Sequence, residues 1–497
     1  MNVLLINAEP FHVEQKTAIP LGLLSIATYL TEHGHIARIY DRVIDGSNLN
    51  RHLIAFHPDI VGVSAIGIKS FQDAIKVSKA VKKKNIPVVW GGQMTSLIPE
   101  IVLKTSVVDY VIMGEGEITM LALMDTITSK TPLYDVDGLA FIENGNIIVN
   151  RQRDFADLSQ LPVIDWSFVD PKKYFVKNVS SNRTLNVYSS KGCPGQCTYC
   201  YNPSYSKCVW RARPAEYFLS EIKYLVETFK IDGVFFADDL LSPNKDYLYS
   251  LCSKIIESNI DFVWGCDMRI ITCNEEDLLH MYDAGCRWIF FGIESGSETR
   301  QKIIKKGTDL VKALETIDFC KKNGIFTTTS FIIGFPDETE EELKETINYI
   351  LKINSDVKIA FFYYPIPNSK MYEDLVKSGV FTAPDTYREW LKFPKLNRLG
   401  KNFSQVPDRD LKVVSAWFLW SSIFGKYHNF KTKSRVFTKK DFGQSLEAFK
   451  RGTPSSIKIV FLAAKEFLLI AYYSALFPSL RKKYGLNKKP NSSNQHI

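Results

Sequence analysis

The chain has 497 residues, of which 45% are hydrophobic and 23% are charged. This composition excludes disordered, collagenous and polytopic membrane proteins, and the length favours two or three domains. The net charge is +8, but residues 421–497 alone carry 15 Lys+Arg and 3 Asp+Glu, a net of +12, which leaves −4 for residues 1–420. A mildly acidic body argues against nucleic acid as a partner and confines the basic character to the C-terminal segment.

The chain has nine cysteines, an odd number for a disulfide framework. The first residues, MNVLLINAEP, do not combine a basic segment with an apolar segment and a cleavage site. We therefore expect a cytoplasmic protein without disulfides. In that compartment, clustered cysteines are more often metal ligands or catalysts.

The first 135 residues alternate short apolar runs with helical patterns, which predicts an α/β domain with a doubly wound, Rossmann-like parallel sheet. Strands are expected at 3–7, 35–41, 59–65, 87–92 and 110–117, with helices at 21–33 and 71–84. Ligands bind such sheets beyond the carboxyl ends of the strands. The residues at those ends are Ser64, Ala65, Ile66, Gly67, Gly91, Gly92, Gln93, Met94, Thr95, Gly114, Glu115, Gly116 and Glu117. Taken alone, ordinary turns explain these glycines slightly better than a ligand does.

A connector over 136–180, with a strand pair turning at Asn144-Gly145, leads to a second alternating series over 181–384. Its predicted strands are 184–190, 233–238, 262–267, 287–293, 327–334 and 357–364, separated by helical patterns near 214–229, 244–258, 275–284, 309–323 and 338–353. Six strands are too few for a closed eight-stranded barrel, so we expect a partial (βα)6 barrel of TIM type. From 385 to 497 the alternation stops, and a mostly helical, basic C-terminal region is expected.

Three cysteines lie close together in the loop after the first barrel strand: Cys193, Cys197 and Cys200. A structural zinc site would normally need a fourth ligand, and no second CxxC segment exists. An iron–sulfur cluster also normally takes four cysteines. Three ligands would leave one iron open to a substrate or cofactor, which a catalytic cluster requires.

The CxxxCxxC spacing, with Tyr199 just before the last cysteine, resembles the radical S-adenosylmethionine (SAM) superfamily. The resemblance covers about 180–370. It extends to the ends of later strands, which read Phe-Ala-Asp238-Asp239, Arg269, Gly292-Ile-Glu294-Ser295-Gly296 and Gly334-Phe-Pro336.

This resemblance implies that Cys193, Cys197 and Cys200 hold a [4Fe–4S] cluster whose fourth iron binds the amino and carboxylate groups of SAM. Reductive cleavage of SAM then yields a 5′-deoxyadenosyl radical. The residues implied in SAM binding are Tyr199, Asp238 or Asp239 for the ammonium, Arg269 for the carboxylate, Glu294 or Ser295 for the ribose, and Gly334 for the adenine. Strand-end caps and surface ion pairs are the alternative for each.

The N-terminal domain in front of this barrel resembles the cobalamin-binding subfamily of radical SAM enzymes. The segments that match are Pro20-Leu21-Gly22, DIVGVSA, GG-Gln93-Met-Thr95 with Pro99-Glu100, and VDYVIMGEGE. The match implies that Ser64 to Gly67, Gly91 to Thr95 and Gly114 to Glu117 line a cobalamin site. Two departures are evident: His12 does not fit the spacing of a cobalt-binding histidine, and Gln93 stands where relatives often carry histidine.

The resemblance implies an enzyme that methylates an unactivated carbon of a small-molecule or lipid-like substrate, using the 5′-deoxyadenosyl radical and methylcobalamin. A flavodoxin or ferredoxin would supply electrons. The alternatives are a non-methylating radical oxidase or cyclase of the same architecture and a cofactor-binding sensor without turnover. Ile459 to Leu480 is apolar but interrupted by Lys465-Glu466, and it is flanked by basic residues. This pattern leaves open peripheral membrane contact or plain packing.

Overall fold

The computed structural model describes residues 1–8, 18–241, 243–392, 399–424 and 472–486. The chain divides into two compact units. Unit 1 comprises Met1–Cys266, Asp283–Gly285 and Pro365–Phe393, and unit 2 comprises Asp267–Tyr282, Cys286–Tyr364 and Pro394–Ile497.

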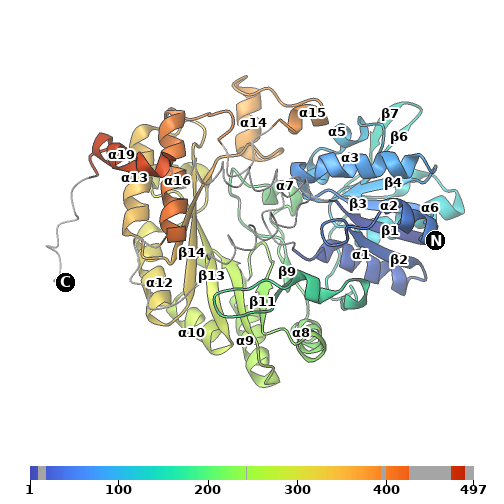
Figure 1. Ribbon diagram of the computed structural model, residues 1–497, viewed down its shortest axis with the longest axis horizontal. Coiled ribbons are helices and arrows are strands. Elements are labelled where there is room, and N and C mark those ends of the chain that lie inside the picture. Colours follow the sequence, from blue (N-terminus) through green and yellow to red (C-terminus); the bar gives the residue numbers. More distant parts are fainter. Residues whose placement is uncertain (9–17, 242, 393–398, 425–471, 487–497) are drawn as a thin grey trace, which may run out of the picture. The chain divides into compact units, whose positions relative to one another are not determined.

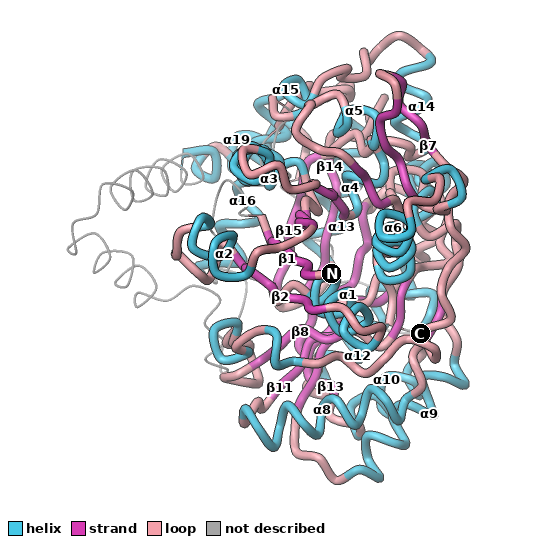
Figure 2. Tube along the Cα trace, turned by 90° about the vertical axis from the view of Figure 1, so that its right-hand side faces the viewer, coloured by secondary structure: helices cyan, strands magenta, loops and turns pink. Residues whose placement is uncertain are grey.

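Unit 1 begins with a seven-stranded sheet of order β2-β1-β3-β4-β5-β6-β7. The strands are β1 Asn2–Asn7, β2 Ile36–Asp41, β3 Ile60–Ser64, β4 Val88–Gly91, β5 Tyr110–Ile112, β6 Leu139–Glu143 and β7 Asn146–Val149. The helices between them are α1 Leu21–Glu32, α2 Leu49–Phe56, α3 Ile68–Lys82, α4 Gln93–Leu97, α5 Pro99–Leu103 and α6 Glu117–Ser129 (Figure 2). The first five strands are parallel, and β1 lies between β2 and β3, so the switch point for ligand binding lies beyond β1 and β3.

The apolar run of β1 is buried on both faces of the sheet, as expected for a parallel strand. Leu4 and Ile6 pack into one hydrophobic cluster, whereas Val3 and Leu5 pack into another. The two faces alternate along the strand because successive side chains point in opposite directions. The sheet therefore has one core on each face.

The predicted doubly wound domain is confirmed, and all five predicted strands form. The strand pair turning at Asn144-Gly145 also forms, but β6 pairs antiparallel with β5 and so extends the first sheet. Helices α2, α4, α5 and α6 were not foreseen, and the strand expected over 110–117 ends at Ile112. These helices are short or follow directly on glycine-rich segments, where periodicity is hard to read.

Three parallel strands of the second series begin in unit 1, in the order β12, β11, β8. They are β8 Thr184–Val187, β11 Gly233–Phe236 and β12 Val263–Met268, accompanied by β9 Ser190–Lys191, β10 Arg211–Ala212, α7 Asn202–Tyr205, α8 Ala215–Phe229, α9 Lys245–Ser258, α14 Lys370–Lys377 and α15 Tyr387–Trp390. Trp390 is buried in a core of the first sheet. Residues 385–392, expected with the C-terminal region, thus pack in unit 1.

Unit 2 contains the remaining strands in the order β15, β14, β13, all parallel. Its elements are β13 Cys286–Glu294, β14 Phe326–Ile333, β15 Val357–Phe362, α10 Glu275–Asp283, α11 Glu298–Ile304, α12 Leu310–Lys322, α13 Glu340–Lys352, α16 Asp408–Phe424 and α19 Phe477–Lys483. Helix α16 packs on β15, and α19 packs on α16 (Figure 1). The predicted alternation of six strands with helices is confirmed, as is the helical character of the described part of the C-terminal region.

Most of the apolar segment Ile459 to Leu480 lies outside the described residues. Among the helices that the structure describes, none has the length and apolar character needed to span a bilayer.

Candidate active site

The cysteine triplet lies in the loop that follows β9. Cys197 is buried, and Cys193 and Cys200 are half-buried. The backbone N–H of Gly195 donates to Sγ of Cys193, and the N–H of Asn202 donates to Sγ of Cys200, each at 3.4 Å. Because N–H donors stabilise negative charge on sulfur, the loop favours the thiolate form at two of its three cysteines.

Gly192 lies at the start of the cysteine loop, and its backbone conformation requires glycine. Its φ is +86°, a region that favours glycine, and a Cβ at this position would overlap the carbonyl oxygen of Val209. The neighbouring residues Lys191 and Arg211 pair antiparallel in the short β9–β10 ladder. The close approach of this ladder leaves no room for a side chain just before Cys193.

The strand ends of the first sheet form a cradle of glycines. A Cβ added at Gly67, Gly91 or Gly114 would have no atom within 4 Å, so each borders open space. Beside them Ile66 is 54% exposed, which is unusual for a large apolar side chain next to a sheet. An open edge with glycines and an exposed isoleucine suits a large, partly apolar ligand.

Two of the predicted site residues, Ala65 and Thr95, are buried and do not line this open edge. Ala65 and Thr95 are fully buried, and the Thr95 hydroxyl donates to the Ala65 carbonyl at 2.9 Å. Gly92 has a φ of +122°, and a Cβ there would lie 2.9 Å from Cα of Ile66. The side chain of Thr95 therefore joins helix α4 to the segment that follows β3, and it does not face the open edge.

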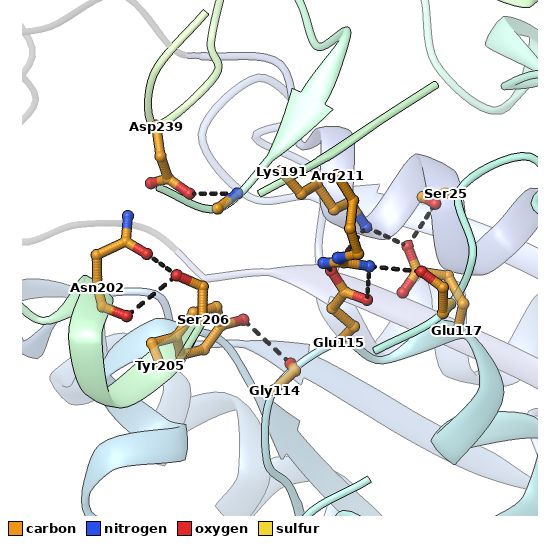
Figure 3. Close-up of polar contacts among 12 residues, drawn as sticks. Ser25, Gly114, Glu115, Glu117, Lys191, Asn202, Tyr205, Ser206, Arg211 and Asp239 are labelled. Atoms are coloured by element: carbon orange, nitrogen blue, oxygen red, sulfur yellow. Dashed lines mark hydrogen bonds and ion pairs between the residues drawn. The ribbon is translucent and has the colours of Figure 1, made fainter. Parts of the chain in front are cut away.

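Glu115 and Glu117 direct their carboxylates toward Arg211 of β10 and Lys191 of β9, the two short strands on either side of the cysteine loop (Figure 3). Arg211 binds Glu115 through two nitrogens, at 2.5 and 3.1 Å. Lys191 Nζ and the Ser25 hydroxyl both donate to one oxygen of Glu117, at 2.9 and 2.6 Å. Burial acts to raise the pKa of Glu117 and to lower that of Lys191, but the opposite charge of the partner, together with the Ser25 hydrogen bond to Glu117 and the acidic groups Tyr188 and Glu115 near Lys191, shifts both pKa values the other way. The two carboxylates predicted for a cofactor thus serve as ion-pair partners of the β9–β10 ladder that flanks the cysteine loop.

Two tyrosines that follow the last cysteine were missed by sequence reasoning. The Tyr205 hydroxyl donates to the Gly114 carbonyl at 3.2 Å (Figure 3). The Tyr201 hydroxyl donates to Asp239 at 2.6 Å and accepts from the Gln93 amide at 2.9 Å. The only local signal is their aromatic character beside Cys200, which by itself indicates packing.

Asp238 and Asp239, at the end of β11, have different surroundings. Asp238 is buried and accepts from the N–H and hydroxyl of Ser189 and from the hydroxyl of Ser190, at 2.6 to 2.8 Å. Burial raises the pKa of Asp238 to about 6 despite these bonds. Asp239 is exposed and also accepts the backbone N–H of Gly192 at 3.1 Å. Of the two predicted acceptors for an ammonium group, the geometry favours Asp239.

In unit 2, Arg269 and Glu294 are both in contact with Lys306. An Arg269 nitrogen donates to the Lys306 carbonyl, and its Nε is buried without a hydrogen-bond partner among the described residues. Lys306 Nζ lies 3.1 Å from the Glu294 carboxylate. Glu294 has a φ of +71° and lies directly after a register shift in the pairing of β13 with β14. A buried orphaned guanidinium nitrogen is costly unless a ligand satisfies it. Lys306, which the sequence did not single out, contacts both Arg269 and Glu294 and belongs to the same cluster of charged residues.

Two further predicted residues of unit 2 are engaged in the fold. Ser295 is fully buried, and its hydroxyl lies 3.1 Å from that of Thr346. Its side chain is therefore unavailable to a ribose, which leaves Glu294 as the candidate. Gly334 has a φ of +78°, and its N–H donates to buried Glu338 at 2.6 Å. A Cβ on Gly334 would lie 3.1 Å from Leu411 of α16.

Comparison with known proteins identifies both halves of this arrangement. Residues 14–124 match the B12 binding domain, and residues 187–350 match the radical SAM superfamily. A protein of Methanocaldococcus jannaschii named as a methylthiotransferase is 33% identical, over 62% of this chain and 67% of its own. The chain belongs to the cobalamin-binding radical SAM enzymes.

Other relatives of this radical SAM enzyme carry different names. An uncharacterised methyltransferase of Pyrococcus horikoshii is 29% identical, over 78% of this chain and 83% of its own. The anaerobic magnesium-protoporphyrin IX monomethyl ester cyclase of Rubrivivax gelatinosus is 24% identical, over 72% and 66%. The structure of TsrM from Kitasatospora setae, a radical SAM methyltransferase with cobalamin and a [4Fe–4S] cluster bound, aligns with a TM-score of 0.73 at 17% identity, covering 95% of this chain and 99% of that one. At this identity the last match shows the fold alone.

The cofactors of a cobalamin-binding radical SAM enzyme are a [4Fe–4S] cluster, SAM and cobalamin. Within the described ranges, no three His, Cys, Asp or Glu side chains surround the position of a single metal ion. The thiols of the triplet are the soft donors that iron–sulfur clusters take. The orphaned Arg269 Nε suits a carboxylate, and the open space at Gly67, Gly91 and Gly114 suits a large cofactor. The residues present fit all three groups.

Proposed function

We propose that this radical SAM enzyme is a C-methyltransferase that acts on an unactivated carbon of a small-molecule or lipid-like substrate. The proposal rests on one observation in unit 1: the elements that flank the cysteine loop, β9, α7 and β10, contact the glycine-rich edge of the cobalamin-binding fold directly. The contacts are Tyr205 to Gly114, Arg211 to Glu115 and Lys191 to Glu117. Two cofactor sites joined in this way would serve one substrate.

We assign the cluster to Cys193, Cys197 and Cys200, and cobalamin to the edge formed by Gly67, Gly91 and Gly114. When bound, the cluster with SAM supplies hydrogen abstraction from carbon, and cobalamin supplies a methyl group. The N–H donors of Gly195 and Asn202 stabilise two thiolates for ligation.

We assign the remaining residues, each within its own unit, to separate groups of SAM. Asp239, exposed at the end of β11, accepts hydrogen bonds and would take the ammonium group. Arg269 offers its buried Nε to the carboxylate. Glu294, held by Lys306, would take a ribose hydroxyl through its second oxygen. Each assignment uses donors or acceptors of the sign that the partner group requires.

The test follows an isotopic methyl group through the full-length, reconstituted protein. It is incubated anaerobically with hydroxocobalamin, titanium citrate and SAM labelled with deuterium in its methyl group. We expect labelled methylcobalamin and S-adenosylhomocysteine by mass spectrometry, and 5′-deoxyadenosine at a slower rate. A cellular extract added as a substrate source should yield a product that carries the label.

Two variants define the outcome. Cys197→Ala should abolish 5′-deoxyadenosine formation, whereas Cys252→Ala, a buried cysteine of α9 outside the loop, should preserve it. Formation of 5′-deoxyadenosine without any labelled methylcobalamin would instead favour a non-methylating oxidase or cyclase, a possibility that the likeness to the cyclase of Rubrivivax gelatinosus supports. Formation of neither product, with both cofactors bound, would favour a sensor.

A further inference from the structure

Four residues of unit 1 form a continuous chain of hydrogen bonds between the two proposed cofactor sites. The Gln93 amide donates to the Tyr201 hydroxyl at 2.9 Å, and this hydroxyl donates to Asp239 Oδ1 at 2.6 Å. The other oxygen of Asp239 accepts the backbone N–H of Gly192 at 3.1 Å. One end of the chain thus lies beside Gly91-Gly92 at the open edge of the first sheet. The other end lies one residue before Cys193.

Tyr201 holds the central place in this chain. A phenol has one proton to donate, and Tyr201 gives it to Asp239, so its lone pair is left for the Gln93 amide. Its ring is half-buried and lies edge-on to that of Tyr205, with centroids 6.0 Å apart. The ring packing and the two hydrogen bonds fix the hydroxyl between the two loops.

We propose that Tyr201 is a positioning residue that couples cobalamin binding to the arrangement of the cluster loop. This inference rests on the proposed cofactor sites. A ligand that orders the start of α4 at Gln93 also orders Tyr201 and Asp239, and through Gly192 it restrains the backbone just before Cys193. The coupling is reciprocal, so an assembled cluster raises the affinity for cobalamin by the same factor.

Tyr205 provides a matched control. It lies four residues further along, and its hydroxyl also bonds to a loop of the first sheet, through the Gly114 carbonyl. That hydroxyl makes no hydrogen bond to Asp239. Removing either hydroxyl deletes one tyrosine hydrogen bond to the same fold, but only Tyr201→Phe interrupts the chain to Gly192.

The experiment measures the dissociation constant of hydroxocobalamin by absorbance, using the full chain with and without a reconstituted cluster. We expect the cluster to tighten binding about fivefold or more in the wild type, the range typical of coupled sites. In Tyr201→Phe the ratio of the two constants should fall clearly below the wild-type value, because the chain to Gly192 is then interrupted while the Lys191–Glu117 and Arg211–Glu115 pairs still join the two sides. Tyr205→Phe should keep the wild-type ratio. Gln93→Leu removes the amide at the other end of the hydrogen-bond chain. It should lower the ratio of the two dissociation constants as Tyr201→Phe does.

The outcomes separate this inference from the proposed function. A wild-type ratio in Tyr201→Phe, or equal loss in Tyr205→Phe, would overturn the role of Tyr201. Cobalamin binding that ignores the cluster in the wild type would overturn the coupling and leave the methyltransferase proposal standing. Failure of the wild type to bind hydroxocobalamin would overturn both. Circular dichroism establishes that each variant is folded before titration.

Discussion

Glu117, the first residue of α6, accepts a hydrogen bond at 2.9 Å from Lys191, which lies two residues before Cys193. The pair joins the cobalamin-binding fold to the cysteine loop across 74 residues of sequence. Glu117 is buried, so removing its carboxylate leaves the ammonium group of Lys191 with a weaker partner in a largely desolvated place.

We expect Glu117→Leu to lower the free energy of unfolding by about 2 kcal/mol, less than for a fully buried pair because Lys191 retains some exposure. The double variant with Lys191→Met should recover part of that loss, since no charge is then left unpaired. Urea unfolding measures both. Glu227→Ala, which removes an exposed pair with Lys223 on α8, should cost less than about 0.5 kcal/mol. Additive losses at Glu117 and Lys191 would show that the pair is not coupled.

The second prediction concerns the glycine before the cluster loop. Gly192→Ala should reduce the iron bound per chain after reconstitution and lower the free energy of unfolding by on the order of 2 kcal/mol. Its φ is +86°, and its Cβ would overlap the Val209 carbonyl. Gly46→Ala is the control, because a Cβ there meets no atom within 4 Å and its φ lies outside the left-handed region. Iron content equal to that of the wild type in Gly192→Ala would contradict the geometry.

The third prediction separates two neighbouring aspartates. Asp239→Asn should weaken SAM binding to the reconstituted protein about tenfold with little change in stability, because the carboxylate is exposed. Asp238→Asn should lower the free energy of unfolding by about 1–3 kcal/mol, because a buried acceptor of bonds from Ser189 and Ser190 is altered. Equilibrium dialysis and urea unfolding provide the two readouts. The reverse pattern would return the ammonium-binding role to Asp238.

The fourth prediction is a pH dependence that arises at Glu338. Burial raises the pKa of Glu338 to about 7 from an ordinary value of 4.5, although the Gly334 N–H and the nearby charge of Arg300 act in the opposite direction. Between these two values the folded protein holds a proton that the unfolded chain has lost. Stability from this residue is therefore complete below about pH 4.5 and falls as the pH rises to about 7.

Glu338→Gln, which cannot ionise, should remove this loss. The unfolding free energies of the variant and the wild type should diverge between pH 5 and pH 8 in favour of the variant, by on the order of 1–3 kcal/mol. Glu341→Gln on the exposed face of α13 serves as the control. A difference that is constant with pH would mean that Glu338 does not titrate in this range.

Much of the fold follows from local patterns in the sequence. The apolar runs that become β1, β3 and β4 are buried on both faces, and such runs indicate parallel strands without knowledge of their partners. The cysteine triplet is equally local, because three thiols within eight residues share one loop whatever the remaining chain does. These two signals indicate the fold class and a cluster site, whereas the family and the cofactors followed from the resemblance of the cysteine spacing and of the strand-end segments to known enzymes.

The tertiary structure decided what individual side chains do. Glu115 and Glu117 belong to a strand-end segment that the sequence assigns to a ligand, yet their carboxylates bind Arg211 and Lys191. Thr95 and Ser295 were expected in cofactor sites but are buried with their hydroxyls bonded within the fold. The aromatic character of Tyr201 beside Cys200 does not reveal its role, because its partners Gln93 and Asp239 are distant in the chain. Local periodicity determines where strands end, whereas the direction of a charged or hydroxyl side chain depends on long-range neighbours that only folding brings together.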